Sequence, residues 1–197
     1  MGGFFVLKKM YIILFFVIIL LIIFAFCYYN TSIFGNNIII KNENKIVDYV
    51  LNNINEYEAE IEVTVQSNKT TNIYEMKQNV SKNYSSIEVL SKGKINGLKI
   101  EFKNNDLKVQ NTELKLDKIY ENYEPLTNNT LFLNTFIEKF KESNSTTYMK
   151  EDNIVFEVPK FGKLYVDMQT SKPKKLEIKD NTKKTNICIN YISIEIK

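Results

Sequence analysis

The sequence has 197 residues, a formal net charge of +3 and no histidine or tryptophan. Without histidine there is no histidine general base and no histidine metal ligand, which argues against an enzyme and against a metal site. All basic residues are lysines and they form no basic stripe, so binding to nucleic acid is not expected.

An uncharged apolar segment, Met10–Tyr29, dominates the N-terminal part of the chain. As a helix it would extend about 30 Å, the thickness of the hydrocarbon core of a bilayer. Lys8 and Lys9 precede it, so the positive-inside rule places the N-terminus in the cytoplasm and the rest of the chain outside. We expect residues 1–29 to be a transmembrane anchor or a lipoprotein signal segment, residues 30–41 a tether, and residues 42–197 a domain on the extracytoplasmic side of the membrane.

Two interpretations of Cys27 stay open. A basic start, an apolar run and a cysteine are typical of a bacterial lipoprotein signal, in which Cys27 would be acylated. However, Phe26 stands where a small residue is usual, and the apolar run is longer than a usual signal core of 7–15 residues. The alternative is an uncleaved single-span anchor. The second cysteine, Cys188, lies in a predicted strand as a small apolar residue, and two cysteines make no disulfide framework.

The domain begins with a predicted helix at residues 42–54, which carries Ile46, Val50 and Ile54 on one face. From Tyr57 the period changes to two, which predicts a strand at residues 57–66 with an acidic outer face that includes Glu60 and Glu62. Further strands are expected at residues 73–80, 84–90, 98–103, 107–111 and 113–116. Short sequential strands with tight turns predict an antiparallel meander.

A polar stretch with Pro125, residues 117–129, predicts a surface loop, and a helix follows at residues 130–143. Its apolar face consists of Leu133, Phe136, Ile137 and Phe140. This face is either a plug on the concave side of a curved sheet or a lid over a lipid or acyl cavity. Strands resume at residues 148–150, 154–159, 164–168, 175–179 and 185–196, the last with Ile192, Ile194 and Ile196 on one face.

The segment Leu164–Ile178, LYVDMQTSKPKKLEI, resembles a hairpin of LolA/LolB/RseB-type proteins, in which a strand ending in Asp enters a Thr-Gly-x-Pro-type turn. Here Asp167 is the turn aspartate and Ser171 stands where glycine is usual. The runs Lys118–Tyr123 and Leu131–Glu138 are similar to the GerS-like germination lipoproteins of clostridia.

The resemblance implies an α+β fold, a curved antiparallel half-barrel sheet with helices on its concave side. It also implies a non-enzymatic, exported and membrane-tethered protein of a spore former. Such a protein would act in spore cortex peptidoglycan modification and germination by binding or activating a cortex amidase. The alternative that the same superfamily offers is a carrier that holds a lipid or a lipoprotein in an apolar concavity.

The residues themselves favour a binding protein without cofactor or metal. No glycine-rich phosphate loop follows a strand, and Glu60 and Glu62 are more simply a solvated strand face than a catalytic pair. A carrier needs an apolar cavity of several hundred Å³, on the order of a small-molecule site. A scaffold protein, which binds another protein on its surface, needs only a filled core and an exposed strand edge or apolar patch.

Overall fold

The computed structural model describes residues 43–104, 106–122, 131–180 and 185–197. The chain separates into two compact units, residues 1–45 and residues 46–197. The predicted anchor at residues 1–29, the tether at residues 30–41 and Cys27 lie outside the described residues, so they remain predictions. No helix among the described residues is long and apolar enough to cross a bilayer.

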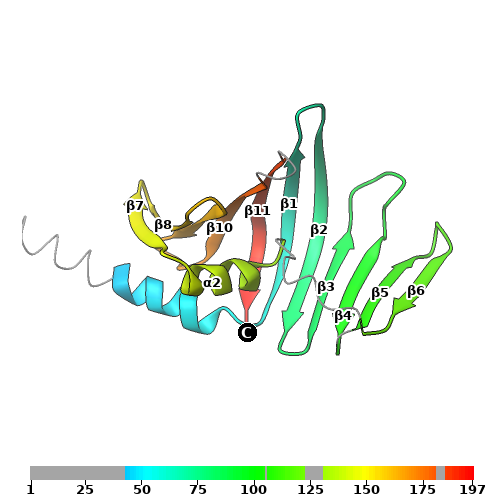
Figure 1. The fold of residues 1–197 in the computed structure, drawn as a ribbon, viewed down its shortest axis with the longest axis horizontal. Helices are drawn as coiled ribbons and strands as arrows, with labels where there is room; N and C mark the ends of the chain where they lie inside the picture. The colour runs from blue at the N-terminus through cyan, green and yellow to red at the C-terminus, as the bar shows by residue number, and fades with distance from the viewer. Residues whose placement is uncertain (1–42, 105, 123–130, 181–184) are drawn as a thin grey trace, which may run out of the picture. The chain divides into compact units, whose positions relative to one another are not determined.

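Two runs of strands make up the sheet. The first run contains β1 (Tyr57–Gln66), β2 (Thr71–Ser81), β3 (Tyr84–Val89), β4 (Lys99–Lys103), β5 (Asp106–Asn111) and β6 (Leu116–Tyr120). The second contains β7 (Thr146–Lys150), β8 (Asn153–Val158), β9 (Gly162–Asp167), β10 (Pro173–Asp180) and β11 (Thr185–Ile196). Within each run every strand pairs with the next, and β1 pairs with β11 to join the runs (Figure 1).

The result is one open antiparallel sheet of 11 strands in the order β6-β5-β4-β3-β2-β1-β11-β10-β9-β8-β7. Strands β6 and β7 are its two edges in the described part of the chain. Together with the helices on one face, this sheet confirms the predicted α+β half-barrel class.

The predicted position of the sixth strand is wrong. Residues 113–115, which the sequence assigns to this strand, belong to a turn over residues 112–115 in which Lys115 has a φ of +51°. The Asn111 side-chain oxygen accepts the Leu114 N–H at 2.8 Å and closes this turn. The strand therefore starts at Leu116, where it was predicted to end, and continues to Tyr120 through the first residues of the stretch predicted as a loop.

Two helices pack on one face of the sheet, which we call the inner face. The first helix covers residues 43–53 and buries Ile46 and Val50. The second, α2 (Leu133–Glu142), packs on β8 and buries Leu133, Phe136 and Ile137. Both helices carry their apolar residues at helical spacing, and those residues join one core cluster with the inward side chains of β1 and β8–β11.

A bulge interrupts the central β1–β11 pairing between Glu60 and Ile61. Because β11 has one residue more than β1 at this point, the alternation of its side chains slips by one position. Ile194 is buried, but Ile192 is 63% exposed. The prediction that Ile192 shares a face with Ile194 and Ile196 is therefore wrong.

Candidate functional site

The inner face has two regions that differ in how they are covered. We call the inner face of β1 and β8–β11 the covered region, because the two helices lie on it. The structure places the predicted residues of α2 here: Leu133, Phe136 and Ile137 are buried, and Phe140 is half-buried. The Phe136 ring stacks on the Phe161 ring with centroids 6.1 Å apart. The Phe140 ring meets the Phe156 ring edge-on at 5.2 Å. These aromatic side chains fill the space between helix and sheet.

A buried hydrogen-bond network fixes the start of α2. The helix has no side-chain cap at Phe132, and the Tyr57 hydroxyl of β1 instead accepts the Leu133 N–H at 3.0 Å. The same hydroxyl donates to Gln78 Oε1 at 3.3 Å, and Gln78 Nε2 donates to the Leu131 carbonyl at 2.9 Å. Burial raises the pKa of Tyr57, so the phenol stays protonated.

This network bears on whether α2 is a plug or a lid. If α2 lifted from the sheet, the buried Tyr57 hydroxyl and Gln78 amide would lose their partners together. Unpaired buried polar groups cost about 1–3 kcal/mol each. The arrangement in the structure is that of a fixed cover.

Beyond β3 the inner face is covered less completely. Among the described residues, Phe102 of β4 is the last side chain of this face in contact with the cover, through the Phe132 ring at a centroid distance of 6.4 Å. The cross-strand register places further apolar side chains on the same face of β4–β6. They lie outside the core cluster and are half-buried, and we call them the open region: Ile100, Leu107, Val109 and Leu116.

The open region ends at the edge strand β6. There Ile119 is 60% exposed on the outer face and Tyr120 is 45% exposed on the inner face. Exposed apolar residues on an edge strand are unusual in a protein that works alone, because an edge can pair with another chain. This end of the sheet is therefore suited to binding a protein partner.

The carboxylate pair considered from the sequence lies on the outer face. Glu62 accepts a hydrogen bond from Asn190 Nδ2 at 3.2 Å, which is a structural contact across β1 and β11. Cys188 lies on the same outer face, and burial raises the pKa of its thiol. Across the ranges that the structure describes, no group of three or more cysteine, aspartate or glutamate side chains could hold a metal ion.

No protein-family model matches the sequence, and no curated protein matches it. Several solved structures have a similar fold. One is the complex of the CwlD amidase with the GerS lipoprotein from Clostridioides difficile, at 21% identity and a TM-score of 0.47 over 78% of this chain and 94% of that chain.

Two further structures have lower identity. A LolA superfamily protein from Nitrosomonas europaea is 10% identical over 80% of this chain and 93% of that chain, with a TM-score of 0.41. An uncharacterized conserved protein from Thermus thermophilus is 10% identical over 78% of this chain and 86% of that chain, with a TM-score of 0.47. At these identities the likeness is one of fold.

Proposed function

We propose that this chain is a non-enzymatic, membrane-tethered protein that presents its domain outside the cytoplasmic membrane and binds a cell-wall amidase. In a spore-forming host the pair would act in modification of the spore cortex peptidoglycan and in germination. The observation that carries the proposal is the open region, a row of apolar side chains on β4–β6 that extends past the described residues of the cover.

A protein partner would gain from covering this region. Completing the burial of each half-buried Ile, Leu or Val contributes on the order of 1 kcal/mol. Strand β6 is also an edge of the sheet among the described residues, and an edge strand can pair with a strand of a partner. The class of partner comes from the resemblance of residues 118–123 and 131–138 to GerS-like germination lipoproteins. The GerS lipoprotein itself was solved in complex with the CwlD amidase.

The alternative is a carrier of lipid or lipoprotein. The covered region does not favour this function, because Leu133 and Phe136 occupy the space that a lipid chain would need and are at most 1% exposed. The network around Tyr57 also holds α2 in place.

The test is capture of the partner by the full chain, purified in mild detergent, from an extract of sporulating host cells. Mass spectrometry then identifies both the proteins and the lipids that are retained. We expect a cell-wall amidase in stoichiometric amount. Lipid without any protein partner would overturn the proposal in favour of the carrier.

A matched pair of variants locates the binding surface. Val109→Asp places a charge in the open region and is expected to abolish capture of the amidase. Ile73→Asp places the same charge at an exposed apolar position on the outer face of β2, and capture should persist. Circular dichroism would be used to check that both variants are folded. Capture that survives Val109→Asp would exclude the open region as the interface.

A further inference from the structure

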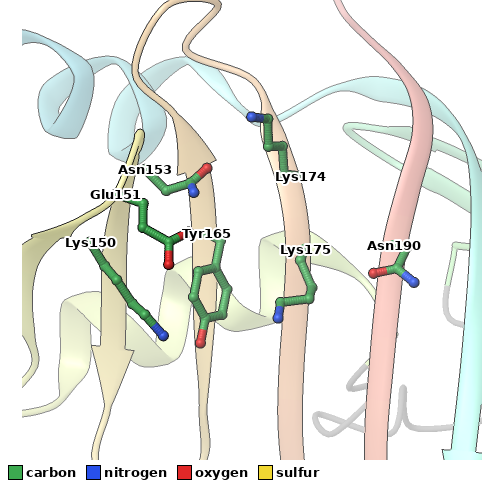
Figure 2. Close-up of a pocket in the computed structure, with 7 residues that line it drawn as sticks. All are labelled: Lys150, Glu151, Asn153, Tyr165, Lys174, Lys175 and Asn190. Atoms are coloured by element: carbon green, nitrogen blue, oxygen red, sulfur yellow. The ribbon is translucent and has the colours of Figure 1, made fainter.

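A polar pocket lies on the outer face of the sheet, opposite the helices, between the β7–β8 turn and strands β9, β10 and β11 (Figure 2). Its volume is about 300 Å³. A water molecule takes about 30 Å³ of liquid, so the pocket has room for one sugar ring but not for a lipid chain or a strand. It is separate from the open region, which is on the inner face.

Positive charge dominates the lining, with three lysines against one glutamate, Glu151. Two of the lysines already have partners. Lys174 pairs with Asp167 at 2.5 Å, and Lys175 pairs with Glu177 at 2.8 Å. Lys150 has no carboxylate within ion-pair distance in the described part of the chain. The pocket therefore holds one ammonium group that can meet an anion without first breaking an ion pair.

Asn153 contributes an unused hydrogen-bond acceptor. Its Oδ1 atom is shielded from solvent and has no hydrogen-bond partner. Figure 2 shows the Asn153 side chain directed toward the pocket from β8. A buried polar atom without a partner is unfavourable, and a ligand hydroxyl or amide N–H would satisfy it once the Asn153 amide turns so that Oδ1 faces the pocket. A bare anion could not, because it has no proton to donate.

Hydrogen bonds hold the walls of the pocket in place before any ligand arrives. The Asp152 carbonyl accepts the Met168 N–H at 3.0 Å and ties the β7–β8 turn to the end of β9. The Tyr165 hydroxyl donates to Glu177 Oε2 at 3.1 Å and fixes the ring that lies in the pocket. In Figure 2, Lys150 and Lys175 extend on either side of this ring. A preformed site loses little conformational entropy on binding.

We propose that this pocket binds an acidic saccharide, a sugar ring that carries a carboxylate. The carboxylate would lie against Lys150, a ring hydroxyl or acetamido N–H would donate to Asn153 Oδ1, and the ring would rest against Tyr165. The combination of one available ammonium, one unpaired acceptor and one sugar-sized space favours this class. A bacterial cell-wall glycan is the expected source; this source, but not the chemistry, rests on the proposed function.

The test uses two sugars that differ by one group. N-acetylmuramic acid and N-acetylglucosamine share a sugar ring, and only the former carries a lactyl carboxylate. Titration of the full chain in detergent at low salt, followed by saturation-transfer NMR, should show saturable binding of N-acetylmuramic acid. N-acetylglucosamine and inorganic phosphate should bind at least about fivefold more weakly, because each lacks one of the two interactions.

Variants assign the two contacts. Lys150→Gln should weaken binding of N-acetylmuramic acid about fivefold and abolish its advantage over N-acetylglucosamine. Asn153→Ala should weaken the binding of both sugars to the same extent. Lys118→Gln on β6 is the control and should bind N-acetylmuramic acid as tightly as the unaltered chain does.

Four results would overturn the proposal: no saturable binding, equal affinity for the two sugars, phosphate as tight as N-acetylmuramic acid, or unchanged affinity in Lys150→Gln. Capture of the amidase reports separately on the proposed function, because Lys150→Gln leaves the open region intact.

Discussion

The covered and open regions of the inner face are built from similar strands, yet they end in different environments. Ile61 and Val63 of β1 are fully buried under the helices, whereas Ile100 of β4 and Val109 of β5 are only half-buried. Each pair follows the same alternation of apolar and polar residues. The difference therefore comes from what packs on the strands. Apolar strand residues mark a surface that needs a cover, and that cover can belong to another molecule.

An aspartate introduced into each of the two regions in turn tests this difference most strongly. Phe136→Asp puts an unpaired carboxylate into the covered region, where Phe136 is 1% exposed. We expect a loss of about 4–5 kcal/mol and an unfolded domain. Val109→Asp puts the same group into the open region, where water still reaches it, and should cost about 1 kcal/mol. Thermal unfolding followed by circular dichroism measures both.

Equal losses in the two variants would abolish the distinction between the regions. A folded Phe136→Asp variant of undiminished stability would show that α2 does not belong to the core. The conservative change Phe136→Leu is a control for packing without charge, and it should cost far less than Phe136→Asp.

Local patterns in the sequence predicted most of the elements, because apolar residues recur clearly with a period of two in the strands and of 3.6 in the helices. They located β1, β11 and the four residues on the apolar face of α2. Asp167 was also predicted as a structural turn residue, and the structure confirms it, since Asp167 Oδ1 accepts the Thr170 N–H at 2.7 Å. Ser171 has a left-handed φ of +57°, a conformation that glycine adopts without strain and that agrees with the glycine usual at this position in the hairpins that the segment resembles.

Contacts between distant residues could not be predicted in this way. The bond from Leu133 N to Tyr57 joins residues 76 positions apart, and the pairing of β1 with β11 spans nearly the whole domain. Gly162 shows the same limit: a Cβ atom there would lie 2.1 Å from the Glu177 carbonyl oxygen, which only the approach of β10 reveals. The open region was missed because its strands have the alternation of buried strands.

Tyr57→Phe tests how firmly α2 is held on the covered region. The change removes one hydroxyl and leaves the Leu133 N–H and the Gln78 Oε1 atom without their partner. We expect a loss of about 1–3 kcal/mol and faster hydrogen exchange at the Leu133 amide. Tyr74→Phe removes a hydroxyl from a half-buried ring on the inner face of β2 and should cost less than about 0.5 kcal/mol. Unchanged exchange at Leu133 in Tyr57→Phe would show that the network does not hold α2.

The smallest effect concerns pH and the turn between β9 and β10. The Lys174 ammonium, followed by hydrogen bonds from Thr170, lowers the pKa of Asp167 from 3.8 to about 2. Because the folded pKa is below the unfolded value, this carboxylate stabilises the fold above pH 3.8, and the stabilisation is lost as the pH falls from 3.8 to 2. Asp167→Asn should therefore cost about 1 kcal/mol at pH 7, and the difference from the unaltered chain should shrink toward pH 2.

Asp117→Asn, on the edge strand beside the open region, is the matched control for this titration. Its carboxylate accepts one long hydrogen bond from Gln110 Nε2 at 3.4 Å, so the change should cost less than about 0.5 kcal/mol at pH 7. Thermal midpoints of the three proteins at pH 7, 4 and 2.5 separate the two sites. We expect the larger pH-dependent loss in Asp167→Asn, because Asp167 has an ion pair with Lys174 and hydrogen bonds from Thr170, whereas Asp117 has one long hydrogen bond. A larger pH-dependent loss in Asp117→Asn would show that the contacts of Asp167 do not stabilise the turn between β9 and β10.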